Sequence, residues 1–453
     1  MSLNFRRILY VIFIIIFILL STIILLYSAG YSYNYKKNKF QPTGGILLEF
    51  DSKEIKIFLN GKFQTATNFL ETSYKIIELP PSKYIVSISK KGFQEWEKTI
   101  KVDSEKVNII KNIILFKKNA IPTLIRQGHL ANFIYSPNNQ TLVFRQIQND
   151  SDFNFKIYNE LTDIYSNIKI SDNEQLINLT LSNKDKNLLV KTFNKNYIYN
   201  FALQKIIDLE QKIPNIKIKN LLWDRQSDYI IYFNDNKKIY RFNLLNYKLD
   251  ELYANDRLPD FFDFDIINGV IYILTIEDDK TILTEIDKNN KSVKLLNFDS
   301  LNFKFQDSPE NFLAIMDKKS QKLTVINIDT KKIIINDNAV NIAWSKKIGG
   351  DYRLAYNNDY EIYIYDFKIN KKNLVGRYSE EVKQIVWYSD FKHLLFQVGE
   401  TLKITDLDYK EKNVQILANQ AKINDFALNF NGEKIYFVGK VGIQEGLFEL
   451  EIF

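Results

Sequence analysis

The sequence predicts a mainly β protein with one hydrophobic helix at its N-terminus. Three observations carry this prediction. An uncharged apolar run of twenty residues, Ile8 to Tyr27, lies near the start of the chain. Short alternating strands bounded by turn residues fill residues 42–118. From there to the C-terminus, a pattern of apolar strands recurs about every 42 residues.

Composition agrees with this fold class. A chain of 453 residues is too long for one ordinary core, so two or more domains are expected. Aromatic residues make up 14% of the chain, and together with the branched aliphatic residues they favour strands. Cysteine is absent, which excludes disulfides, a thiolate nucleophile and a Cys-based zinc site.

The positive charge is concentrated at the N-terminus. The formal net charge is +7, and residues 1–40 contribute +5 of it through two arginines and three lysines with no acidic residue. The remaining body therefore carries only about +2, which does not form the concentrated basic face of a nucleic-acid-binding protein. The basic residues flank the hydrophobic run, where cations meet lipid head groups.

The apolar run is long enough to cross a lipid bilayer. Twenty helical residues rise about 30 Å, the thickness of a hydrocarbon core. A cleaved signal peptide is the alternative, because Ser28-Ala29-Gly30 offers small residues for cleavage. The run exceeds the usual apolar region of roughly 7–15 residues in signal peptides, which favours an uncleaved anchor at 8–27.

The side of the membrane follows from size rather than from charge. Arg6 and Arg7 precede the run and three lysines follow it, so the positive-inside rule is nearly balanced. A short tail at 1–7 and a large body after the helix favour a cytoplasmic tail and an extracytoplasmic body. Residues 28–41 are interpreted as a linker.

A small β domain is predicted for residues 42–118. Its strands are expected at 44–48, 55–59, 84–88, 99–102 and about 107–116. Asn60-Gly61 is a strong signal for a two-residue hairpin turn. The short strands predict a small antiparallel β-sandwich.

This segment resembles the PEGA domain family. The matching residues are the strand and turn Ile57-Phe58-Leu59-Asn60-Gly61-Lys62, the strand 84–88, and Lys91-Gly92-Phe93 leading to Trp96 and the strand 99–102. Residues 51–54, Asp-Ser-Lys-Glu, replace the tetrapeptide that names the family. The resemblance implies an Ig-like, surface-associated module without catalytic residues, which acts as a spacer. Phe93 and Trp96 are expected in its core.

The remaining residues, 121–453, are predicted to form a β-propeller. An apolar strand ending in an aromatic residue or Leu recurs every 39 to 46 residues, and a second strand begins about seven residues later. These anchor residues are Tyr135, Leu181, Trp223, Phe264, Phe305, Trp344, Trp387 and Leu428. Four strands per unit of this length are typical of a propeller blade. Eight blades are preferred, and seven remain open because the first unit is the longest.

Two further features fit a closed ring. Ser136-Pro137-Asn138-Asn139 resembles the Ser-Pro-Asp-Gly turn of WD40-like and TolB-like propellers. The last unit has only three strands, and the orphan segment 121–125 is predicted to supply the fourth, which would remove the exposed edges of an open ring. The tryptophans at anchor positions are expected to pack between blades.

The sequence offers no catalytic, cofactor-binding or metal-binding residues. His129 and His393 have no His or Cys partner at ligand spacing, so both are interpreted as structural. The acidic pair Asp263 and Asp265 and the cluster Glu277-Asp278-Asp279 lack the spacing of a calcium loop, and the cluster is predicted to be a solvated hairpin tip. No nucleophile elbow, phosphate loop or dinucleotide motif is present.

Two functions remain open at this point. The first is a non-enzymatic envelope protein that is anchored through Ile8 to Tyr27 and offers the propeller as a platform for a protein or a glycan. The second is an envelope hydrolase or lyase with its site in the propeller channel. The second would require charged groups from several blades at one level, and the sequence shows no such convergence, so the first is preferred.

Overall fold

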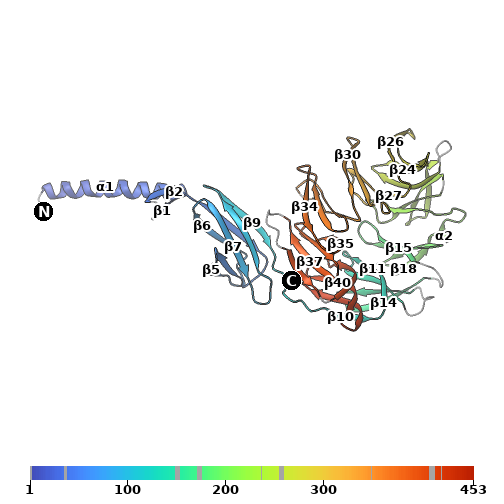
Figure 1. The fold of residues 1–453 in the computed structure, drawn as a ribbon, viewed down its shortest axis with the longest axis horizontal. Coiled ribbons are helices and arrows are strands. Elements are labelled where there is room, and N and C mark those ends of the chain that lie inside the picture. Colours follow the sequence, from blue (N-terminus) through green and yellow to red (C-terminus); the bar gives the residue numbers. More distant parts are fainter. Residues whose placement is uncertain are drawn as a thin grey trace. The chain divides into compact units, whose positions relative to one another are not determined.

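The computed structural model of the chain describes residues 3–34, 38–147, 154–170, 176–235, 237–254, 260–347, 349–407, 414–419 and 421–453. The chain divides into two compact units, one built around Met1–Asn119 and the other around Ala120–Asp408 and Ile416–Ile452. Strands dominate both units (Figure 1).

The first unit begins with helix α1, Leu3–Ser28. Its segment Arg6–Ser28 is long and apolar enough to cross a membrane, and an N-terminal signal sequence has the same properties. The predicted linker 28–41 is not plain coil, because it contains most of a β-hairpin of β1, Tyr31–Asn34, and β2, Lys39–Pro42.

Two sheets with a shared core follow the hairpin. One has the order β6-β3-β9 and the other the order β5-β4-β7-β8. Their strands are β3 Gly44–Phe50, β4 Lys56–Leu59, β5 Lys62–Ala66, β6 Ser73–Leu79, β7 Ser82–Ser89, β8 Trp96–Val102 and β9 Val107–Ile113. Buried residues of both sheets form one cluster that includes Trp96, and Phe93 packs against it, as predicted.

The prediction of a wholly antiparallel module was wrong for one pair of strands. β3 pairs with β9 in parallel. A parallel pair requires a crossover connection, and here the chain passes through the second sheet, including β7 and β8, before β9 returns beside β3. The turn between β4 and β5 has Asn60 and Gly61 at positive φ, 49° and 74°, the conformation expected of an Asn-Gly hairpin turn.

The second unit is a β-propeller of repeated four-stranded antiparallel sheets, and eight such sheets lie within the residues described for it. We number them in chain order. Sheet 1 is β11 Leu130–Ser136, β12 Thr141–Gln146, β13 Asn154–Asn159 and β14 Ile164–Lys169; sheet 2 is β15 Leu176–Leu181, β16 Asn187–Thr192, β17 Asn196–Asn200 and β18 Lys205–Asp208, followed by the short helix α2, Leu209–Lys212. Sheet 3 is β19 Leu221–Trp223, β20 Ile230–Asn234, β21 Lys238–Asn243 and β22 Lys248–Ala254; sheet 4 is β23 Phe261–Ile267, β24 Val270–Glu277, β25 Lys280–Ile286 and β26 Ser292–Phe298.

The later sheets repeat this plan. Sheet 5 is β27 Phe303–Gln306, β28 Phe312–Asp317, β29 Lys322–Asn327 and β30 Lys332–Asn338; sheet 6 is β31 Asn341–Trp344, β32 Arg353–Asn357, β33 Glu361–Asp366 and β34 Lys371–Arg377. Sheet 7 is β35 Val382–Trp387, β36 His393–Val398, β37 Thr401–Asp406 and β38 Val414–Ala418; sheet 8 is β39 Ala421–Leu428, β40 Lys434–Val441 and β41 Gln444–Glu451.

The fourth strand of sheet 8 comes from the start of the unit. β10, Thr123–Gln127, pairs antiparallel with β41, so the ring closes between the two ends of the unit (Figure 1). The segment predicted to serve this purpose, 121–125, overlaps the observed strand. Seven hydrophobic clusters, each drawn from two neighbouring sheets, form the core. The tryptophans 223, 344 and 387 belong to three of these clusters, as predicted.

Candidate functional site

The first strand of each sheet lies toward the centre of the ring. It is the terminal strand of its own sheet, and first strands of neighbouring sheets contact one another, as β31 and β35 do. All eight anchor residues of the repeat lie on these first strands. The repeat in the sequence therefore marks the recurrence of the inner strand from one sheet to the next.

Amide side chains on the inner strands, or directly before them, link three pairs of neighbouring sheets. Asn220 Nδ2 donates to the Phe262 carbonyl over 2.6 Å, and Asn341 Nδ2 donates to the Lys383 carbonyl over 2.9 Å. Gln384 Nε2 donates to the Phe426 carbonyl over 3.1 Å. These bonds join sheets 3 and 4, 6 and 7, and 7 and 8, so the amides stabilise the ring.

Two tryptophans form a second kind of bridge, in the opposite direction. Trp223 Nε1 donates to the Thr180 carbonyl over 3.2 Å, and Trp387 Nε1 donates to the Ala343 carbonyl over 2.9 Å. Each acceptor directly precedes the anchor residue of the preceding sheet. Trp344 occupies the same position in sheet 6, and its buried Nε1 has no acceptor among the described residues.

Charged residues also lie on and beside the inner strands. Arg225 forms a 2.6 Å ion pair with Asp265 of sheet 4 and donates to the Ser308 carbonyl of sheet 5. Asp263 accepts a 2.9 Å hydrogen bond from the Phe305 amide. Burial raises the pKa of Asp263 to about 6 and also raises the pKa of Asp265, against the opposing effect of the Arg225 charge.

Electrostatic interactions link charged groups of sheets that are distant in sequence. Burial lowers the pKa of Lys191, in sheet 2, and the positive charge of Lys304, in sheet 5, lowers it further. Asp185, in sheet 2, has a pKa raised mainly by burial, while Lys346, which follows β31 of sheet 6, acts in the opposite direction. The centre of the ring is therefore polar and mixed in charge.

The two histidines lie apart from this centre and from each other. His129 lies between β10 and β11, and its Nδ1 is 2.6 Å from Glu445 Oε1 at the ring closure. His393 begins β36, is buried, and its Nδ1 is 2.7 Å from Asp390 Oδ2. Both contacts join a histidine to a carboxylate of its own or the adjoining sheet. The two histidines do not contact each other, and a structural role remains the prediction for both.

The structure separates the two acidic groups that the sequence analysis weighed. Asp263 and Asp265 are buried on β23 and hold neighbouring sheets together. Asp278 and Asp279 form the tip between β24 and β25, with φ of 48° and 57°, and are exposed as predicted for a hairpin turn. Within the described ranges, no group of three or more His, Cys, Asp or Glu side chains could hold a metal ion.

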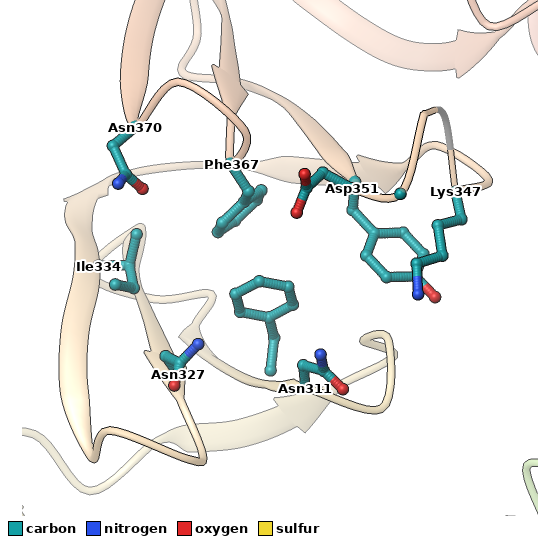
Figure 2. Close-up of a pocket in the computed structure, with 10 residues that line it drawn as sticks. Asn311, Asn327, Ile334, Lys347, Asp351, Phe367 and Asn370 are labelled. Atoms are coloured by element: carbon teal, nitrogen blue, oxygen red, sulfur yellow. The ribbon is translucent and has the colours of Figure 1, made fainter.

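A pocket opens between sheets 5 and 6, and none of its lining residues belongs to an inner strand (Figure 2). Its volume is about 160 Å³. Sheet 5 contributes Asn311, Phe312, Asn327 and Ile334, and sheet 6 contributes Lys347, Gly350, Asp351, Tyr352, Phe367 and Asn370. The pocket combines aromatic rings, three amides and one charge of each sign, so it can make both stacking contacts and hydrogen bonds.

The sequence analysis missed both the polar centre and the pocket. The central groups come from β16, β23 and β27, which are distant in sequence and meet only when the ring closes. The pocket had one local signal, the pair Gly349-Gly350, because glycine is rare in this chain at 15 of 453 residues. Adjacent glycines mark a turn that the repeat itself does not require.

No family model matches the chain, and no curated protein matches it. Solved structures with a similar arrangement include the C-terminal WD40 domain of Sif2, with 13% identity, 73% of this chain and 98% of that chain covered, and a TM-score of 0.48. The dihydro-heme d1 dehydrogenase NirN aligns with 10% identity, coverage of 70% and 75%, and a TM-score of 0.47. An oligogalacturonate lyase from Vibrio parahaemolyticus aligns with 9% identity, coverage of 72% and 98%, and a TM-score of 0.43.

Proposed function

We propose that this chain is a membrane-anchored, extracytoplasmic and non-catalytic binding or scaffold protein of the cell envelope. In this proposal α1 remains uncleaved in the bilayer, residues 42–118 form a PEGA-like spacer, and the propeller is the interaction platform. Each four-stranded sheet counts as one blade, which gives eight blades.

The length of α1 supports the anchor. The candidate span Arg6–Ser28 has 23 residues, enough to cross a hydrocarbon core of about 30 Å with some tilt. Signal peptides have a shorter apolar region of roughly 7–15 residues. The two-sheet module after the helix has an Asn-Gly hairpin and a buried Trp96 at the positions where the PEGA resemblance expects them.

The non-catalytic assignment rests on one observation, the partners of the buried carboxylates. Asp263 and Asp265 are engaged by the Phe305 amide and by Arg225, each from another sheet. A carboxylate whose hydrogen bonds join two sheets is held in place by groups of the protein itself. Catalysis would require such a group to face a substrate with its oxygen available for proton transfer.

The alternative, an envelope hydrolase or lyase with its site in the channel, is favoured by a different observation. A pKa of about 6 would suit Asp263 for general acid–base catalysis near neutral pH, and lysines of sheets 2 and 5 lie in its electrostatic environment. Incubation with envelope polysaccharides discriminates the two functions. New chain ends that appear with the parent and not with Asp263→Asn would establish the enzyme.

Protease shaving of intact host cells tests the location. The proposal expects an external protease to digest the propeller and to leave a short membrane-bound fragment that contains α1. A body protected until the cells are lysed would reverse the orientation. A mature protein that begins near residue 30 and is released from membranes would replace the anchor with a signal peptide.

A further inference from the structure

The wall of the pocket between sheets 5 and 6 is an extended turn. β31 ends at Trp344 and β32 begins at Arg353, so eight residues join them. In the other seven sheets, the first two strands are joined by two to six residues. Gly349 and Gly350 have φ of 58° and 99°, which allows the chain to reverse before it reaches Asp351 and Tyr352. The other seven sheets connect their first two strands with shorter turns, so the extra residues are not needed for the connection. Here they form the wall of the pocket.

The floor of the pocket is rigid and aromatic. The Phe312 and Phe367 rings lie 4.3 Å apart, and both pack within 5.5 Å of the Trp344 ring. The Tyr352 ring meets Phe312 edge to face at 6.4 Å and remains partly exposed. The Lys347 Nζ lies 6.0 Å from the centroid of the Tyr352 ring. Because the packed rings of Phe312 and Phe367 hold one another, the partly exposed Tyr352 ring is a pre-organised surface beside the opening.

The rim of the pocket has unused hydrogen-bonding capacity. Within the described part of the chain, the side chains of Asn311, Asn370 and Asp351 have no hydrogen-bond or ion-pair partner, and Figure 2 shows them around the opening. Asn327 Oδ1 accepts hydrogen bonds from the backbone amide and the hydroxyl group of Thr330. Its Nδ2 is left to donate to a ligand. Amides both donate and accept, so they match hydroxyl groups, which also do both.

Charge and size restrict the ligand. Lys347 and Asp351 both line the pocket. Asp351 would repel a strongly anionic ligand, and Lys347 would repel a cationic one. The volume of about 160 Å³ lies below the roughly 300–1,000 Å³ of pockets for drug-sized ligands. A single ring with several hydroxyl groups meets both conditions.

We infer that this pocket binds one neutral sugar residue of a glycan. The C–H face of the sugar ring packs against Tyr352, and its hydroxyl groups bond to Asn311, Asn370 and Asp351. This inference rests on the proposed binding function and specifies its ligand class. A peptide side chain is the competing occupant, and it is an outcome of the test.

The test uses the full-length protein in detergent on an array of immobilised neutral oligosaccharides, acidic oligosaccharides and peptides. The parent is expected to bind neutral glycans. Asn311→Ala combined with Asn370→Ala is expected to weaken that binding at least tenfold. Asn290→Ala is the matched control, because Asn290 has φ of 60° in the corresponding turn of sheet 4, as Asn370 has 49° in sheet 6, and lies outside the pocket.

Three outcomes would overturn the inference. They are binding to peptides or to acidic glycans alone, binding to none of the probes, and equal loss in the control and in the double variant. Circular dichroism of each variant shows whether it has folded, and Asp351→Asn replaces the double variant if that one unfolds. The array does not depend on membrane topology. A propeller digested from outside the cell together with a negative array would reject the sugar site and leave the proposed location intact.

Discussion

The indole Nε1 of Trp387 donates a 2.9 Å hydrogen bond to the carbonyl oxygen of Ala343, across the boundary between sheets 7 and 6. Trp223 makes the corresponding bond to Thr180 between sheets 3 and 2. The spacing of the repeat thus places a donor on one inner strand beside a carbonyl of the preceding inner strand. Trp344 shares the phase of the repeat, and its Nε1 has no acceptor within the described ranges of the chain.

We expect Trp223→Phe to destabilise the protein more than Trp344→Phe. Both substitutions remove the same atoms from a half-buried site, but only the first leaves a carbonyl without its partner. Loss of one partner of a buried hydrogen bond costs about 1–3 kcal/mol, whereas removal of an unpaired buried donor is nearly neutral. Urea unfolding of the full-length variants in detergent, followed by circular dichroism, measures the difference. Equal losses would show that the indole bond contributes nothing beyond packing.

The ion pair between Arg225 and Asp265 gives a second prediction. Arg225→Met leaves a buried carboxylate without its cation, which costs about 3–5 kcal/mol of unfolding free energy at neutral pH. Because burial raises the pKa of Asp265 in the folded state, acidification protonates it there first and restores part of the loss. Unfolding measured at pH 7.5 and at about pH 5 checks both effects.

The control for this pair is an exposed one. Lys238 and Glu251 lie 2.7 Å apart, and their side chains are 42% and 45% exposed. Lys238→Met should change the unfolding free energy far less than Arg225→Met does, because water screens the charges. A loss as large as that of Arg225→Met would mean that burial is not what distinguishes the two pairs.

Asp263 gives a prediction about pH. Its folded pKa of about 6 exceeds an unfolded value near 3.9, so between these values the folded state binds more protons. Its contribution to stability therefore falls as pH rises from about 4 to 6 and stays unfavourable above. Asp263→Asn keeps an oxygen for the Phe305 amide and should be more stable than the parent at pH 7, by up to ~3 kcal/mol. Urea unfolding across this range tests it, and a difference that is the same at pH 4 and pH 7 would contradict it.

Ring closure gives the fourth prediction. A Cβ at Gly446 would collide with the Arg126 carbonyl and the Leu124 side chain, so Gly446→Val should separate β10 from β41. Hydrogen exchange at residues 123–127 is expected to accelerate at least tenfold. Gly442→Asn is the control, because Gly442 has open space around it and Asn tolerates its positive φ of 59°. Unchanged protection of β10 in Gly446→Val would show that the pairing of β10 with β41 tolerates the added side chain.

The accuracy of the sequence-based interpretation depended on the range of the interactions involved. Asn60-Gly61 and Asp278-Asp279 were predicted as turns because local backbone preferences decide such positions. The parallel pairing of β3 with β9 was missed, since no local pattern reports which strand of a distant segment will lie alongside. The hairpin formed by β1 and β2 was likewise missed, because the polar composition of residues 28–41 was interpreted as a linker.

The sequence by itself determined the apolar length of α1, the period of the repeat and the anchor residues on the inner strands. Those features follow from hydrophobic periodicity, which the chain carries residue by residue. Only the tertiary structure brought Arg225 to Asp265, 40 residues away, and to Ser308, 83 residues away. It also brought Lys191 near Lys304, because packing of the sheets around the ring joins segments that are distant in sequence. The pocket between sheets 5 and 6 was decided in the same way, by the packing of an extended turn against a neighbouring sheet.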